Sequence, residues 1–172
     1  MRKLLMVIPL VVLLCFTFSC QKGEEVAEEP VVDIKAEEAS VKDFLDQFKQ
    51  AFSSMDLELF SKLIAQDDDL IFIGTDAAEY WIGWEPVKEA IKDIDEAVDS
   101  VEILVDKQTI VVHKSGEVAW FSEVFTQKTV VQEETLTHEG LRWTGVLEKR
   151  NGNWILVQLH GSQPVSGQLV EY

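Results

Sequence analysis

The chain is poor in cysteine. Its 172 residues include only Cys15 and Cys20, and both precede the acidic stretch that begins at residue 21. The sequence after Cys20 has no thiol, so it can form no disulfide, no thiolate nucleophile and no cysteine-based metal site. The three histidines have no ligand-like spacing, and no phosphate-binding glycine loop or serine elbow occurs. We expect neither a metal nor a cofactor.

Basic residues are also scarce. The chain carries 15 Lys and Arg against 31 Asp and Glu, a formal net charge of −16. Residues 1–19 contain Arg2 and Lys3 but no acid, so without them 13 basic residues stand against 31 acidic ones and the net charge is −18. Such a charge repels phosphate backbones and anionic lipid surfaces. We therefore expect no nucleic-acid partner, and solubility is the simplest explanation of the acidity.

No apolar run is long enough to span a bilayer, which takes roughly 20 residues in a helix. The longest run covers residues 4–18, is interrupted by Pro9 and Thr17, and follows the cationic start Met1-Arg2-Lys3. A short apolar run behind a cationic start is typical of a secretory signal peptide. We therefore expect the protein to be exported.

The run ends at Thr17-Phe18-Ser19-Cys20, which resembles the lipobox of bacterial lipoproteins, although Thr17 stands where those sequences prefer leucine. The resemblance implies that residues 1–19 are removed as a signal peptide and that Cys20 becomes the first residue, acylated with lipid such as palmitate. An uncleaved anchor and an ordinary secretory signal are the alternatives. Because Gln21 replaces the Asp of an inner-membrane retention signal, we expect the periplasmic face of the outer membrane if the source is Gram-negative.

The next segment has the composition of a solvated linker. Residues 21–35 are acidic and contain no aromatic residue and no sustained hydrophobic period. We therefore divide the chain into a signal peptide (1–19), a lipidated cysteine with an acidic tether (20–35), one domain (36–163) and a C-terminal tail (164–172). A domain of that length can build a single hydrophobic core.

Three segments have the 3.6-residue period of amphipathic helices. The first lies within residues 36–54, the second follows Asp56, which can cap it, and the third begins near Pro86, a residue suited to a first turn. The apolar face of the first segment consists of Val41, Phe44, Leu45, Phe48 and Phe52.

Strand patterns fill the rest of the domain. A short hairpin of residues 70–73 and 79–82 precedes the third helix, and four long strands follow at 101–113, 117–131, 136–150 and 153–163. Asp106-Lys107 predicts a bend in the first long strand, and Asn151-Gly152 predicts a tight turn because both residues tolerate positive φ. Helices segregated from a mainly antiparallel sheet indicate an α+β domain.

This order of elements resembles the cone-shaped fold of the nuclear transport factor two-like superfamily and, within it, the SnoaL-like domains. Residues 72–76 with 79–83 resemble the first hairpin of that family, 117–120 its long third strand, and 151–157 with His160 and Ser162 its final hairpin. The resemblance covers about residues 36–163. It implies three N-terminal helices packed on a curved, mainly antiparallel sheet, with an apolar pocket at the open end. It does not decide function, since the superfamily includes isomerases, cyclases, dehydratases and binding modules.

Aromatic side chains should line such a pocket together with a few polar groups. For each aromatic candidate, core packing or a dimer contact is the alternative role. The aromatic candidates are Phe44, Tyr80, Trp81, Trp84, Trp120 and Trp143.

The polar candidates are Asp76, Glu123, Arg142, His160 and Ser162. The resemblance implies proton transfer by carboxylates with His or Tyr in the enzymes, which makes Asp76, Glu123 and His160 the candidate catalytic residues. A strand Glu is more often exposed, and Asp is expected at a turn for local reasons. Arg142 could bind the carboxylate of a ligand or point outward and solubilise the sheet.

The last strand has two apolar faces. Strict alternation places Trp154, Leu156, Gln158, His160 and Ser162 on one face, and Ile155, Val157 and Leu159 on the other. Parity therefore does not decide whether His160 faces the pocket. A sheet with two apolar faces should be covered on its back, which predicts a homodimer.

These features favour a membrane-tethered lipoprotein that binds a small, largely apolar ligand. A cofactor-free isomerase, lyase or hydrolase on a small organic substrate is the first alternative, and it would bring Asp76 or Glu123 against His160 in a cavity. A structural or assembly lipoprotein is the second, and its core would leave no cavity. The expected ligand contacts are Tyr80, Trp81, Trp120, Arg142, Trp143 and His160.

Overall fold

The computed structural model describes residues 32–165 and 167. The expected signal peptide, Cys20 and most of the expected tether lie outside these residues. The unit that begins at Val32 contains its own hydrophobic core, all of whose members lie between Ile34 and Leu159. Within the described residues, no helix is both long enough and apolar enough to cross a membrane.

Within the described residues, three helices precede the long strands, as predicted: α2 (Ile34–Ser54), α3 (Leu57–Leu63) and α4 (Trp84–Ala97). The helix α2 begins two residues before the expected domain boundary, because the Asp33 side chain accepts hydrogen bonds from the backbone N–H groups of Lys35 and Ala36 at 3.1 Å. Asp56 caps α3 as expected, accepting from the backbone N–H of Leu59 at 2.9 Å.

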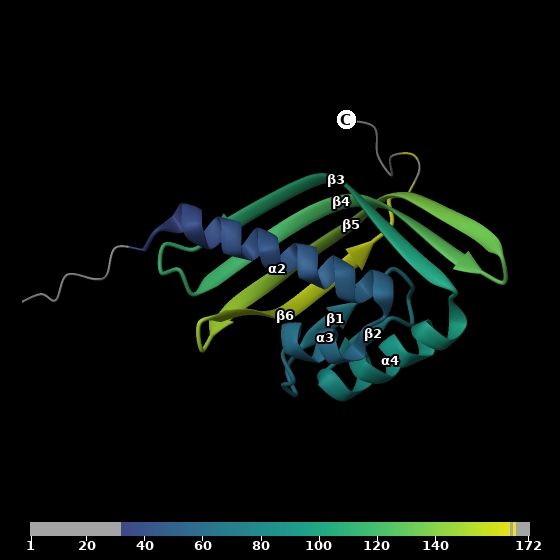
Figure 1. The fold of residues 1–172 in the computed structure, drawn as a ribbon, viewed down its shortest axis with the longest axis horizontal. Coiled ribbons are helices and arrows are strands. Elements are labelled where there is room, and N and C mark those ends of the chain that lie inside the picture. The colour runs from purple at the N-terminus through teal and green to yellow at the C-terminus, as the bar shows by residue number, and fades with distance from the viewer. Residues whose placement is uncertain (1–31, 166, 168–172) are drawn as a thin grey trace, which may run out of the picture. The chain divides into compact units, whose positions relative to one another are not determined.

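Six strands form one mixed sheet. They are β1 (Ile71–Ile73), β2 (Tyr80–Ile82), β3 (Ser100–Val112), β4 (Val118–Val131), β5 (Glu134–Arg150) and β6 (Asn153–Ser162). Their order in the sheet is β2-β1-β6-β5-β4-β3, and only the β1–β6 pair is parallel. Figure 1 shows α2 lying across one face of the curved sheet, with α3 and α4 near the β1–β2 hairpin. The predicted α+β architecture is confirmed.

Two-residue turns connect the last three strands. Asn151 and Gly152 have φ values of 52° and 82°, as the sequence predicted. Between β4 and β5, Gln132 and Glu133 have φ values of 50° and 69°. This turn is shorter than the four residues expected, so β5 begins at Glu134.

Bulges bend the long strands. The β3–β4 register shifts between Val105 and Lys107, which confirms the bend predicted there. Further shifts occur in β4–β5 between Phe125 and Gln127 and in β5–β6 beside Leu147. A bulge leaves one residue unpaired, bends the strand and increases its local twist. The curvature of the sheet therefore comes from defined positions in three neighbouring strand pairs.

The bulge in the β5–β6 pair overturns strict alternation along β6. Leu156 pairs with Leu147 while Gln158 pairs with Val146, so Val157 is the extra residue. Trp154 and Leu156 are buried before the bulge, and Leu159 and Gly161 are buried after it. His160 is exposed. The prediction that Trp154 and His160 share a face is therefore wrong.

Aromatic rings fill the core between α2 and the sheet. The rings of Phe60 and Trp143 each pack edge-on against Phe48 at a centroid distance of 5.6 Å. Burying each such side chain contributes about 2–3 kcal/mol relative to leaving it exposed. This layer of rings continues into a pocket at one end of the sheet.

Candidate functional site

A pocket of about 270 Å³ lies where the β1–β2 hairpin, the end of α4 and the strands β4–β6 meet. Five aromatic side chains line it: Phe52, Phe72, Trp81, Phe125 and Trp143. The aliphatic lining consists of Ile73, Ile94, Val98, Val101, Leu141 and Leu159. The pocket is therefore walled by apolar groups from α2, α4 and all six strands.

Packing holds the aromatic wall in place. The ring of Trp143 lies 4.4 Å from that of Phe125 and 5.5 Å from that of Phe52, centroid to centroid. On the opposite side, Phe72 and Trp81 are register partners of β1 and β2, and their rings are 6.1 Å apart. Since Trp143 also contacts the core ring of Phe48, the pocket wall and the core form one packed unit.

A polar pair from β4 interrupts the apolar wall. The amide of Gln127 donates a hydrogen bond from Nε2 to Oγ1 of Thr129 at 3.0 Å, and both residues line the pocket. Thr129 is buried, with 9% of its surface exposed. A buried hydroxyl is uncommon in an apolar pocket unless it is hydrogen-bonded, and such a group is suited to orienting a ligand.

The other polar side chains of the pocket lining are Thr75, Glu79, His138 and Gln163. His138 on β5 is the register partner of Gln127. The carboxylate of Glu79 accepts hydrogen bonds from the backbone N–H groups of Thr75 at 2.7 Å and Asp76 at 2.9 Å, so it stabilises the β1–β2 turn. In the part of the chain that the structure describes, no lysine and no arginine line the pocket.

The β4–β5 bulge explains why His138 reaches the pocket. Phe125 pairs with Leu141, whereas Gln127 pairs with His138, so β5 carries an additional residue in this interval. Gly140 occupies it with a φ of 70°, a conformation that favours glycine. Leu141 and His138 therefore both line the pocket although their sequence positions have opposite parity. The isolated glycine in a strand pattern was the available signal for this bulge.

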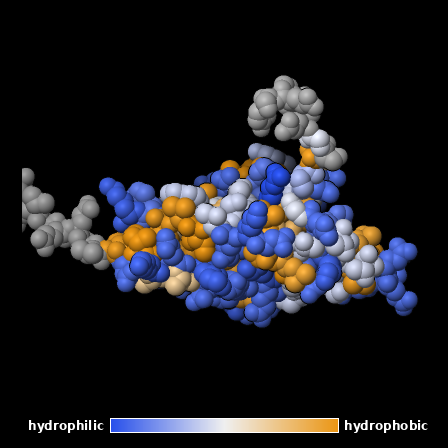
Figure 2. Space-filling view, turned by 90° about the horizontal axis from the view of Figure 1, so that it is seen from above, coloured by the Kyte–Doolittle hydropathy of each residue, from blue (hydrophilic) through white to orange (hydrophobic). Residues whose placement is uncertain are grey.

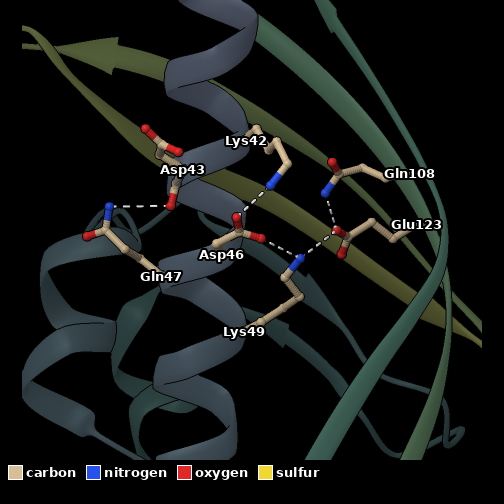
Figure 3. A network of polar contacts seen from close by, with 7 residues as sticks. All are labelled: Lys42, Asp43, Asp46, Gln47, Lys49, Gln108 and Glu123. Carbon is tan, nitrogen blue, oxygen red and sulfur yellow. Dashed lines mark hydrogen bonds and ion pairs between the residues drawn. The ribbon is translucent and has the colours of Figure 1, made fainter.

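A second polar site lies beneath α2. Glu123 on β4 is 1% exposed, and its Oε1 accepts from Gln108 Nε2 at 2.7 Å and from Lys49 Nζ at 3.3 Å. Lys49 also contacts Asp46, which in turn contacts Lys42, as Figure 3 shows. The expectation that Glu123 is exposed is therefore wrong, because a helix lysine compensates its burial. Hydrogen bonds from Lys42 and Lys49 lower the pKa of Asp46.

Comparison with known proteins identifies the family of this domain. Residues 41–166 match the family model for the SnoaL-like domain. The chain belongs to the SnoaL-like domain family. Among curated proteins, no sequence matches the chain.

Solved structures share the fold of this SnoaL-like domain at low sequence identity. A nuclear transport factor 2-like superfamily protein from Salmonella enterica serovar Typhimurium has a TM-score of 0.71 and 17% identity, over 80% of this chain and 98% of that one. A protein described as a putative dehydratase from Streptomyces avermitilis has a TM-score of 0.69 and 14% identity, over 77% and 99%. A protein described as a putative scytalone dehydratase from Novosphingobium aromaticivorans has a TM-score of 0.67 and 11% identity, over 76% of this chain and 86% of that one. Identities this low establish the fold alone.

The SnoaL-like domain brings only two of the six expected ligand contacts to its pocket, Trp81 and Trp143. Tyr80, Trp120, Arg142 and His160 are exposed and do not line it. Arg142 lies between the two buried residues Leu141 and Trp143, and alternation directs its side chain to the other face of the sheet.

The remaining candidates also lie away from the pocket of the SnoaL-like domain. Trp84 and Phe44 are buried in the core, and Ser162 is half-buried at the end of β6. Asp76 is exposed at the β1–β2 turn, where its side chain accepts from the backbone N–H of Ala78 at 2.9 Å.

The proposed catalytic pairs do not form. The hydrogen-bond partners of Glu123 are Lys49 and Gln108, and those of Asp76 belong to its own turn. His160 is exposed away from the pocket. Within residues 32–165, no group of three or more His, Cys, Asp or Glu side chains is placed to hold a metal ion.

Proposed function

We propose that the protein is a membrane-tethered lipoprotein whose SnoaL-like domain binds a small, largely apolar ligand. The observation that carries this proposal is the pocket of about 270 Å³ walled by five aromatic side chains and interrupted by few polar groups. Ligand sites have this character, and volumes of roughly 300–1,000 Å³ accommodate drug-sized molecules. The volume here supports a ligand of about one ring.

The membrane tether rests on the first twenty residues. A cationic start, an apolar run too short to span a bilayer and the approach to Cys20 support export, cleavage and acylation. Thirteen residues separate Cys20 from the start of α2 at Ile34. Fully extended, they reach about 45 Å at 3.3–3.6 Å per residue, which keeps the pocket close to the membrane surface without embedding it.

A second copy of the chain is the partner proposed for the back of the sheet. Trp120 on β4 is 46% exposed, and beside it Val111, Val146 and Phe121 line a shallow hollow. An exposed aromatic over an apolar hollow is typical of a protein interface. Figure 2 shows a mostly hydrophilic surface with separate apolar patches, the largest toward the end of the domain where α2 begins.

A cofactor-free isomerase, lyase or hydrolase is the second candidate function. It is favoured by His138, which lines the pocket and can accept or donate a proton in reach of a bound ligand. Two of the similar structures are described as putative dehydratases. Among the described residues, Glu79 is the only carboxylate in the pocket lining, and it is already hydrogen-bonded to two backbone N–H groups, so the binding function is preferred.

Ligand titration of residues 21–172 tests the proposal. Trp81 and Trp143 line the pocket, so small ring compounds should change the tryptophan fluorescence saturably. Val98→Phe, which narrows the pocket from the end of α4, should weaken this response, whereas Arg142→Ala on the other face should preserve it. A response that does not saturate, or that Val98→Phe leaves unchanged, would contradict the proposal. Conversion of a bound compound that His138→Ala abolishes while binding survives would establish the enzyme instead.

A further inference from the structure

The polar pair in the pocket presents two donors and one acceptor to a ligand, because the Gln127 amide keeps its second N–H. Gln127 uses its Nε2 to donate to Oγ1 of Thr129, so the Thr129 oxygen acts as the acceptor in that bond. The Thr129 hydroxyl proton is left to donate, and the Gln127 amide oxygen is left to accept. Within residues 32–165, neither side chain makes a second hydrogen bond.

Apolar side chains flank this pair on β4 and β3, and His138 lies opposite Gln127 on β5. Phe125 precedes it on the same side of β4, and Val101 of β3 is the register partner of Thr129. Within residues 32–165, no lysine or arginine lines the pocket, and the one carboxylate in its lining belongs to Glu79. Burying an unpaired carboxylate costs far more than burying a hydrogen-bonded neutral group. The lining therefore selects against anionic ligands, and the net charge of −16 acts in the same direction.

A hydroxyl group complements the pair better than a carbonyl group does. A ligand hydroxyl can donate to the Gln127 amide oxygen and accept from the Thr129 hydroxyl at once. A carbonyl can only accept, which leaves the Gln127 oxygen without a partner. A ligand that covers the Gln127 oxygen without bonding to it loses affinity, so the difference should be measurable.

We infer that the pocket takes an uncharged ring compound bearing one hydroxyl group, an alcohol or a phenol, which Thr129 and Gln127 recognise. The ring packs against Trp143 and Phe125, whose planes already form the wall beside the pair. This inference rests on the proposed binding function and narrows it to one ligand class. It also replaces the carboxylate ligand expected from Arg142, since that guanidinium is exposed on the other face.

Calorimetric titration of residues 21–172 with three compounds of matched shape tests the inference. The probes are 4-methylphenol, p-xylene and 4-methylbenzoate, which place a hydroxyl, a methyl and a carboxylate on the same ring. We expect 4-methylphenol to bind at least fivefold more tightly than p-xylene, and 4-methylbenzoate to bind more weakly than both. One hydrogen bond contributes about 0.5–1.5 kcal/mol, which corresponds to roughly two- to tenfold in affinity.

Two variants test whether Thr129 and Gln127 cause the preference for 4-methylphenol over p-xylene. Thr129→Val keeps the side-chain shape and removes the hydroxyl, so it should lower the 4-methylphenol affinity about fivefold and leave that of p-xylene unchanged. Gln127→Met removes the acceptor, so it should also lower the 4-methylphenol affinity and leave that of p-xylene unchanged. It replaces Thr129→Val as the test if circular dichroism shows that Thr129→Val does not fold. Thr144→Val on the other face of β5 is the matched control and should change neither affinity.

The possible results distinguish failure of this inference from failure of the proposed binding function. Equal affinities for 4-methylphenol and p-xylene, or binding of 4-methylbenzoate as tight as that of the phenol, would overturn the ligand class while the binding pocket stands. If Thr129→Val weakens the binding of p-xylene as much as that of 4-methylphenol, the inferred ligand class is also wrong. Failure of all three compounds to bind would overturn the inference together with the proposed binding function.

Discussion

Lys49 and Glu123 form an ion pair that joins the middle of α2 to the sheet, with Nζ 3.3 Å from Oε1. The side chain of Glu123 is 1% exposed and that of Lys49 is 16% exposed, so solvent screens the pair little. Gln108 donates to the same oxygen at 2.7 Å, and the second oxygen, Oε2, has no hydrogen-bond partner within the described residues. The pair therefore compensates a buried charge more than it adds net stability.

Replacing Lys49 with Met should destabilise the protein, because it leaves the Glu123 carboxylate buried without a counter-charge. We expect a loss of about 3 kcal/mol in the free energy of unfolding, measured by urea denaturation. The double variant Lys49→Met with Glu123→Leu should recover most of that loss. The matched control is Lys62→Met, whose partner Glu58 is exposed, and it should have no measurable effect. A Lys49→Met protein as stable as the wild type would contradict the compensating role.

Asp46 should contribute to the loss of stability in acid. Its pKa in the folded state lies below the ordinary value of 3.8, first because of the hydrogen bond from Lys42 and then because of that from Lys49. Because the folded state holds the proton less tightly than the unfolded state, this contribution is present above about pH 4 and is lost as the pH falls through the folded pKa. Denaturation at pH 6, 4 and 3 should give a shallower decline for Asp46→Asn than for the wild type.

The Asp46 effect should be small, since half of the side chain is exposed and solvent screens its contacts. Asp43→Asn is the control, since it removes an exposed carboxylate of the same helix that forms no ion pair within residues 32–165. If the free energy of unfolding falls equally with decreasing pH in Asp46→Asn and the wild type, the Lys42 and Lys49 contacts do not contribute to acid stability.

A charge at Trp120 should separate the proposed dimer. Residues 21–172 should sediment as a dimer at micromolar concentration, and Trp120→Glu should shift the protein to monomer, because a carboxylate at the interface would be desolvated without a partner. Tyr80→Glu is the control, since it changes an exposed aromatic on the edge strand β2. If the wild-type protein sediments as a monomer across the micromolar range, the proposed dimer through the face around Trp120 is wrong.

Lipidation should depend on Cys20. Cys20→Ala should move the protein from the membrane fraction to the soluble fraction of cells and prevent normal processing. Cys15→Ala, within the apolar run, should leave lipidation intact. Mass spectrometry of the wild-type protein should show acyl groups on an N-terminal Cys20, and an unmodified cysteine there would exclude the tether.

Local signals in the sequence determined the order and type of the elements. The period of 3.6 located the helices, Asp56 marked the start of α3, and Asn151-Gly152 marked the last turn. Each of these depends on residues within a few positions of one another, because caps and tight turns satisfy their own backbone groups. The fold class follows from that order.

Only the tertiary structure decided which side chains meet in the site. His138 reaches the pocket and His160 does not, because bulges in the β4–β5 and β5–β6 pairs shift the alternation by one residue. A one-residue shift exchanges the two faces of a strand, and it depends on pairing with another strand rather than on the strand itself. Glu123 is likewise buried because Lys49, 74 positions earlier, lies over it once α2 packs on the sheet.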